Sequence, residues 1–189
     1  MPRFTTAAML SLVAGIAAPA AGMAADRWTA DPAESELTWS VPFSGKPLPG
    51  RFNQFASEIV FDPQDLAGSS VAVTVQIGSV EAQGEEQTME LLKPEWFNAD
   101  TFPTATFAAE TFRAVGGDAY EADGTLTIRD QSRPITLPFT FAIEGDSAHI
   151  SGGTTISRLD YGVGQGDWAI DDVIGFPVTI SFDLMATRG

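Results

Sequence analysis

The sequence predicts an all-β domain of roughly eight short antiparallel strands, arranged either as a barrel or as a sandwich. Apolar and polar residues alternate with a period of two through most of the chain after residue 26, as in strands with one buried and one solvated face. Turn-forming groups such as Asp62-Pro63 and Gly116-Gly117-Asp118 separate the alternating stretches. Only one stretch reads as helical, which is too little for an α/β fold.

The chain begins with the pattern of a secretory signal peptide, which we assign to residues 1–25. Arg3 precedes an apolar run at residues 7–21, and small residues follow up to Ala24 and Ala25, where we expect cleavage. A membrane anchor retained at the N-terminus is the less favoured alternative. Residues 26–189 then form a single domain of a size that can bury one core. We expect this mature chain to be periplasmic.

The alternation locates the strands in order along the chain. It is clear at residues 36–43, 70–77, 124–130, 136–144 and 178–185, and weaker at residues 27–29, 57–61, 105–112, 120–122 and 149–156. Gly152-Gly153 reads as a turn. A short helical segment is expected near residues 84–97, where glutamates are interspersed with Met89, Leu91 and Leu92 before Pro94.

Composition argues against several classes of function. The chain has no cysteine, one histidine and a formal net charge of −15, and loss of Arg3 with the signal peptide would make it one unit more negative. Such a charge disfavours binding to nucleic acid or to anionic lipid surfaces. His149 is the only imidazole, no acid–histidine pair is readable near a serine, and no Gly-x-Ser-x-Gly motif occurs, so we predict no catalytic residue. We also predict no zinc or copper site, because such sites favour nitrogen and sulfur ligands and the chain offers no cysteine and only one histidine. No cofactor is predicted either.

Calcium is the one metal that an acidic chain without cysteine could still bind, since it takes oxygen ligands. Asp160, Asp167, Asp171 and Asp172 could form an oxygen-rich loop, but their spacing does not match an EF-hand. An enzyme that uses an apolar pocket is a further alternative for the chain as a whole.

Aromatic side chains dominate the predicted interior, and five of them fall between residues 96 and 112. A closed barrel of about eight strands is wide enough either to be filled by its own side chains or to hold one slender ligand. A sandwich has a filled core and offers no such choice. Aromatic abundance alone favours a filled core.

Several local motifs occur in a recognisable order. They are W-x-x-D-P-x-x-S at residues 28–35, G-R-F-N-Q-F at 50–55, F-D-P at 61–63, E-W-F-N-A-D-T-F-P-T-A-T-F at 95–107, G-T-L-T-I-R-D-Q-S-R-P-I at 124–135 and S-R-L-D-Y-G-V-G at 157–164. Together they resemble the YceI-like, or polyisoprenoid-binding, family of exported lipocalin-like proteins, from about residue 28 to residue 186. The resemblance implies an eight-stranded antiparallel lipocalin-like barrel over residues 26–189, with an apolar channel for a long isoprenoid tail.

Two departures from the family pattern affect the expected partners. Many members carry Arg-Asp-x-His-Leu where this chain has Gln-Thr-Met-Glu-Leu at residues 87–91, so the family's head-group contacts cannot be transferred. The stretch G-Q-G-D-W at residues 164–168 is similar to variant domains found beside b561-type cytochromes. That similarity implies a membrane cytochrome as a partner.

We therefore expect a non-enzymatic, exported protein that binds or carries an isoprenoid lipid, such as a quinone or a polyprenyl lipid, with the tail inside the barrel. The alternative is a filled barrel that serves as an interaction module of a membrane cytochrome. The sequence leaves open which lipid is bound and whether the chain forms a homodimer. Arg51 and Arg158 are the residues expected at the mouth. The residues expected on the channel wall are Trp39, Phe43, Phe52, Phe55, Trp96, Phe97, Phe102, Phe107, Phe112, Leu126, Ile128, Phe139, Phe141 and Phe182.

Overall fold

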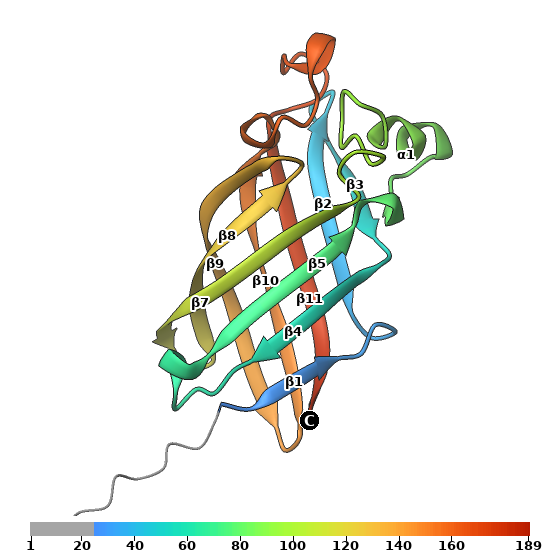
Figure 1. Cartoon of the computed structure of the whole chain (residues 1–189). Coiled ribbons are helices and arrows are strands. Elements are labelled where there is room, and N and C mark those ends of the chain that lie inside the picture. The colour runs from blue at the N-terminus through green and yellow to red at the C-terminus, as the bar shows by residue number, and fades with distance from the viewer. Residues whose placement is uncertain (1–24) are drawn as a thin grey trace, which may run out of the picture.

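A computed structural model describes residues 25–189 (Figure 1). The predicted signal peptide, apart from Ala25, lies outside the described residues. The strands are β1 (Arg27–Ala30), β2 (Glu36–Phe43), β3 (Lys46–Phe52), β4 (Phe55–Val60), β5 (Ser70–Gln76), β6 (Val80–Glu81), β7 (Thr104–Gly116), β8 (Ala119–Ile128), β9 (Gln131–Glu144), β10 (Ser147–Ser157) and β11 (Pro177–Arg188). One α-helix, α1 (Glu85–Leu91), accompanies them in this part of the chain, with short 3-10 turns at Leu66–Gly68, Ile77–Ser79, Arg158–Tyr161 and Gly166–Trp168. No helix within residues 25–189 has the length and apolar character needed to cross a membrane.

The strands close into an antiparallel barrel of eight strands, three of which are interrupted. β11 pairs with β1 near one end and with β2 near the other, so β1 and β2 are two halves of one barrel strand. β4 pairs with β1 and β5, while β3 pairs with β2 and β6, so β3–β4 and β5–β6 are interrupted in the same way. β7 to β11 follow as a meander of neighbouring strands. The predicted barrel is confirmed.

The period-two pattern explains which face of each strand lies inside. In β7, Ala105, Phe107 and Ala109 are buried and alternate with exposed residues. Because a strand points successive side chains to opposite faces, the same alternation in the neighbouring strands lines the interior with apolar groups. Apolar side chains therefore face the interior along the length of the barrel.

The sequence pattern does not predict β3, because this strand contains Pro47 and Pro49. Proline cannot donate a hydrogen bond to a neighbouring strand and is confined to edges and strand ends. Here both prolines face β2 partners in register, while the opposite neighbour, β6, reaches only Arg51 and Phe52. The proline-containing half of β3 is thus a free edge, where a missing N–H is tolerated.

The prediction of a turn at Gly152-Gly153 is wrong, because both residues lie in the middle of β10. A side chain at Gly152 would meet the Phe182 ring at 2.8 Å and the Pro138 carbonyl oxygen at 2.5 Å. These glycines allow close packing of neighbouring strands rather than a reversal of the chain. The two strands predicted at residues 120–122 and 124–130 belong to the single strand β8, which ends at Ile128.

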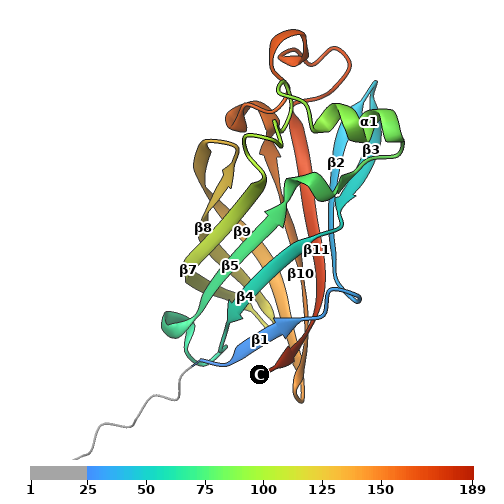
Figure 2. The ribbon, with the colours of Figure 1, turned by 45° about the vertical axis from the view of Figure 1, so that its right-hand side comes forward.

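The helical segment is shorter than the predicted range of residues 84–97. α1 ends at Leu91, and the chain continues through turns in which the Phe97 N–H donates to the Leu91 carbonyl and the Trp96 N–H to the Lys93 carbonyl. Pro94 cannot continue an α-helix, since its ring clashes with the preceding turn. Residues 92–99 therefore fold as a compact cap over one end of the barrel, beside α1 (Figures 1 and 2).

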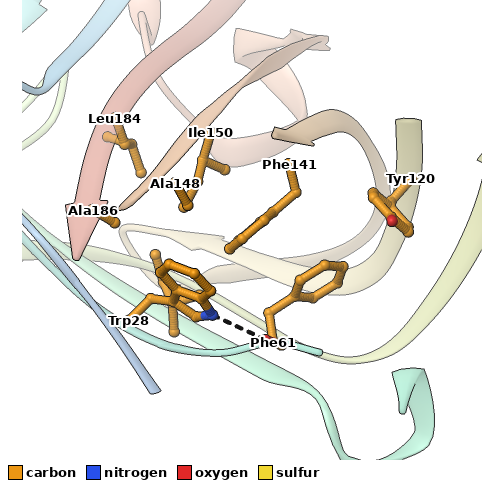
Figure 3. Close-up of a cluster of buried hydrophobic side chains, with 9 residues drawn as sticks. Trp28, Phe61, Tyr120, Phe141, Ala148, Ile150, Leu184 and Ala186 are labelled. Carbon is orange, nitrogen blue, oxygen red and sulfur yellow. Dashed lines mark hydrogen bonds between the residues drawn. The ribbon is translucent and has the colours of Figure 1, made fainter. Parts of the chain in front are cut away.

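A packed aromatic cluster closes the opposite end of the barrel, near the C-terminus (Figure 3). We call it the plug; its buried members are Trp28, Ile59, Phe61, Tyr120, Phe141, Ala148, Ile150, Leu184 and Ala186. The rings of Phe61 and Phe141 stack with centroids 4.4 Å apart, and Trp28 meets Phe141 edge-on at 5.3 Å. The Trp28 indole N–H donates to the Phe61 carbonyl oxygen at 2.9 Å. The plug therefore closes this end of the barrel with packed side chains.

Candidate ligand-binding cavity

The barrel encloses a cavity of about 240 Å³ between the plug and the cap. Its wall reaches from Phe61 and Phe141 in the plug to Leu91 and Trp96 under the cap. Along β10 it extends from Ile150 to Ile156, roughly 20 Å at about 3.3 Å per residue. The barrel is therefore hollow, and the hollow is long and narrow.

The cavity wall is almost entirely hydrocarbon. Ser57, Ser70, Thr106 and Thr154 contribute small polar groups, and Arg158 is the only charged residue on the wall among the described residues. Burial, and to a lesser degree Asp160, raises the pKa of the Tyr161 phenol, so this wall residue stays uncharged at neutral pH. A space of this kind suits an apolar chain and excludes ions.

Twelve of the fourteen residues predicted for the channel lie on the cavity wall. They are Trp39, Phe52, Phe55, Trp96, Phe97, Phe107, Phe112, Leu126, Ile128, Phe139, Phe141 and Phe182. Whether they contact a ligand stays a prediction.

Phe43 and Phe102 do not line this cavity, although Phe43 lines the second cavity described below. Phe43 ends β2, where it bridges to Ile174, and is 40% exposed. Phe102 precedes β7, and its ring centroid lies 5.5 Å from the guanidinium carbon of Arg129. Both sit beyond the closed part of the barrel, where alternation no longer determines which way a side chain points.

The prediction, which emphasised aromatic rings, missed most of the aliphatic part of the wall apart from Leu126 and Ile128. Those residues include Val71, Val73, Val75, Ile135, Leu137, Ile150, Ile156, Val178, Ile180 and Leu184. The same period-two alternation would have identified them, because they occupy the apolar face of strands that were otherwise correctly located.

Neither arginine predicted at the mouth is available to a ligand there. Arg51 lies on the outer face of β3 and forms an exposed ion pair with Glu81, 3.0 Å from Nη2 to Oε1. The hydrogen bond from Arg51 lowers the pKa of the Glu81 carboxyl. Arg51 therefore joins β3 to β6 on the outside, as their register also shows.

Arg158 is buried and binds backbone rather than ligand. Its Nε donates to Gly175, its Nη1 to Val163 and Gly164, and its Nη2 to Trp168, Ile170 and Ile174, all through carbonyl oxygens at 2.6 to 3.2 Å. The five N–H donors of a guanidinium are thus all used. Burial lowers the pKa of this guanidinium, and Asp171 raises it by less. Arg158 holds the loop of residues 159–176 over the barrel.

A second cavity of about 290 Å³, which we call the vestibule, lies between α1 and the β2–β3 hairpin. It shares Trp39, Val41, Leu91, Trp96 and Ile174 with the wall of the inner cavity. These shared side chains stand between the two spaces. The vestibule also has polar walls from Glu86, Gln87 and Glu90 on α1.

Gly50 positions Trp39 between the two cavities, and we expect Gly50→Ala to destabilise the protein. A methyl group at this position would overlap the Trp39 ring and approach the Glu81 carbonyl oxygen at 2.5 Å. Overpacking of this kind costs about 1–3 kcal/mol. Thermal unfolding and near-UV circular dichroism would measure the loss and the displaced indole. Gly78→Ala is the control, since a methyl group at that position would meet no atom within 4 Å; equal stability of the two variants would contradict the assignment.

The remaining polar residues considered from sequence form no second site. His149 lies on the outer face of β10, where Nε2 is 2.9 Å from Asp183 Oδ1. Within residues 25–189, no three acidic or imidazole side chains come close enough together to hold a metal ion.

Comparison with known proteins agrees with this architecture. The family model of the YceI-like domain matches residues 28–186. The crystal structure of Burkholderia cenocepacia BcnA is similar with a TM-score of 0.81 and 30% identity, over 84% of this chain and 99% of that chain. A polyisoprenoid binding domain from Saccharophagus degradans has a TM-score of 0.70 at 17% identity, over 87% of this chain and 99% of that one, and shows the fold alone.

Curated relatives are similar over a shorter stretch. A UPF0312 protein of Vibrio cholerae is 30% identical over 122 residues, which is 61% of this chain and 65% of the relative. The chain thus spans about 65% of the length of the first curated relatives it matches. A UPF0312 protein of Shewanella baltica is 28% identical over 160 residues, 81% of this chain and 82% of the relative. Since the family model covers most of its length, this chain belongs to the YceI-like domain family.

Proposed function

We propose that this protein binds one isoprenoid lipid, with the tail in the barrel cavity, and carries or sequesters it without covalent chemistry. The observation that carries the proposal is the long apolar cavity of about 240 Å³ enclosed by the barrel. The polyisoprenoid-binding description of the Saccharophagus degradans domain supports the choice of ligand class. Export to the periplasm belongs to the same proposal and is supported by the signal-peptide pattern at residues 1–25.

Burial of the tail would supply most of the binding free energy. An apolar cavity of about 150 Å³ already binds a molecule of benzene in preference to water. Each methylene transferred from water into such a wall contributes about 0.8 kcal/mol, so a tail of several isoprene units binds tightly with few polar contacts.

The hollow interior argues against the filled-barrel alternative. A partnership with a membrane cytochrome, inferred from residues 164–168, stays a prediction, and so does homodimer formation. Both concern the outer surface and are compatible with a lipid inside.

Native mass spectrometry of freshly purified protein tests the proposal. We expect an adduct of one lipid per chain, which organic extraction followed by mass analysis would identify as an isoprenoid. The apo protein should then take up an added isoprenoid at the same ratio. Purification without any adduct, together with failure to take up added isoprenoid quinone, polyprenol or hydrocarbon, would refute the proposed function.

A further inference from the structure

The loop of residues 159–176 projects beyond the strands at the end of the barrel opposite the plug, as the orange-red segment at the top of Figures 1 and 2. Its crest, residues 169–173, has the sequence A-I-D-D-V, and all five residues are exposed. Ile170 is 55% exposed and Val173 is 44% exposed. Neither side chain lines one of the two cavities or packs in a buried apolar cluster, so the barrel and its ligand do not explain them.

Exposed apolar side chains concentrate around this loop. Five large hydrophobic residues are exposed within residues 25–189, and three of them, Phe43, Ile170 and Val173, belong to the loop or to the end of β2 beside it. The Ser44 N–H donates to the Val173 carbonyl oxygen at 2.7 Å, and Phe43 bridges to Ile174, so the two segments are joined. Single exposed hydrophobic residues are common on protein surfaces, whereas a local concentration of them marks an interaction site.

The crest is held in place from beneath by Arg158. The Nη2 atom of this residue donates to the carbonyl oxygens of Trp168, Ile170 and Ile174 at 2.6 to 3.1 Å. Gly164, with a φ of +81°, lets the loop wrap around the guanidinium, because a Cβ atom there would lie 2.1 Å from Nη1. A backbone that is fixed before binding loses little conformational entropy when a partner binds. The loop therefore presents its crest on a rigid support, as binding loops do.

The charges around the crest determine which partner it suits. The loop has no lysine or arginine and carries four exposed aspartates, Asp160, Asp167, Asp171 and Asp172. The cations beside it are Lys46 at the tip of the β2–β3 hairpin and the buried Arg158, and the chain as a whole has a formal net charge of −15. Like charges therefore disfavour a second copy of this chain or an anionic lipid surface on the crest. Segments that bind membranes usually carry lysine and arginine beside their apolar side chains, which the loop lacks.

We propose that the crest docks onto a partner protein that presents a basic surface patch. Ile170 and Val173 pack into an apolar depression of that patch, and lysine or arginine side chains around the depression pair with Asp171 and Asp172. Apolar contacts at the centre supply the affinity, and the charges at the rim guide the encounter and select the partner. This inference is independent of the proposed function, because no crest residue lines either cavity.

Photo-cross-linking in cells that express the full chain natively tests the docking. Ala169 is replaced with the photo-reactive amino acid p-benzoylphenylalanine, which keeps Ile170 and Val173 in place. We expect an adduct with another protein, and mass spectrometry should find lysine and arginine in the cross-linked peptide of that protein. The same amino acid in place of Val115, another exposed apolar residue, on β7, is the control and should not give this adduct.

Two double variants of the cross-linking chain show whether the adduct depends on the apolar side chains and on the charges. Ile170→Ser/Val173→Ser should lower the adduct yield by at least about tenfold, and Asp171→Asn/Asp172→Asn by at least about threefold. Thermal unfolding should stay unchanged, since all four side chains are exposed. The inference would be overturned by a yield that either double variant leaves unchanged, by a cross-linked peptide without basic residues, by cross-links to phospholipid or to a second copy of this chain instead, or by no adduct above the control.

Discussion

Replacing Ser57 with phenylalanine is expected to abolish most of the isoprenoid uptake while leaving the protein folded. Ser57 lies on β4 and lines the inner cavity, opposite Val73 of β5 in register. A phenyl ring there would occupy space that a tail needs. Each displaced methylene costs about 0.8 kcal/mol of tail burial, and 1.4 kcal/mol is tenfold in affinity, so the loss should exceed roughly tenfold.

Stability should change little, because the added ring enters an existing cavity rather than a filled core. Ala56→Phe is the matched control, since Ala56 is the exposed neighbour on the same strand. Titration of both variants with farnesyl benzoquinone, alongside thermal unfolding, would separate blocked binding from misfolding. Wild-type affinity in a folded Ser57→Phe variant would show that the ligand binds elsewhere.

The second large effect is expected for Arg158→Met, which should lower the free energy of unfolding by about 3–5 kcal/mol. The side chain is 3% exposed and satisfies carbonyl oxygens from Val163 to Gly175. Methionine fills similar space but donates nothing, so those carbonyls lose their partners. For a domain of this size the melting temperature should fall by on the order of 10 °C.

Arg158→Lys should recover only part of this loss, because an ammonium group has fewer donors and no planar fork. Arg51→Met serves as the control, since its single ion pair with Glu81 is exposed and should matter little for stability. Differential scanning calorimetry of the three variants measures their melting temperatures, which should be lowest for Arg158→Met, intermediate for Arg158→Lys and highest for Arg51→Met. If Arg158→Met melts like the wild type, then the loop of residues 159–176 is held by other contacts.

The two arginines show how far residue type alone can mislead. Arg51 and Arg158 both lie in motif-bearing segments that the sequence pattern indicated as loop-like, and a free guanidinium is a good partner for an oxygen-rich head group. In the structure Arg51 pairs with Glu81 outside the barrel, and Arg158 donates all its hydrogen bonds to six backbone carbonyl oxygens. No local pattern could distinguish these outcomes, because the carbonyls around Arg158 come from a loop whose path is set by long-range packing.

The interior aromatics were easier to predict. Phe107, Phe139 and Phe182 lie in strands with regular alternation, and all three reach the cavity wall. Phe43 and Phe102 lie at a strand end and in a loop, and neither does. Period-two reasoning holds only where both neighbouring strands keep a residue in register.

Within the regular strands, alternation was sufficient to establish which residues face inward, since the geometry of a strand forces successive side chains to opposite sides. It also established, with the ordered motifs, that the fold is a closed antiparallel barrel. Whether the barrel retains empty space, and which carbonyl oxygens Arg158 binds, emerged from the folded arrangement alone. These properties depend on how strands from distant parts of the chain pack and how far their side chains reach into the interior. The period of a sequence pattern gives the direction of each side chain but not the volume left between them.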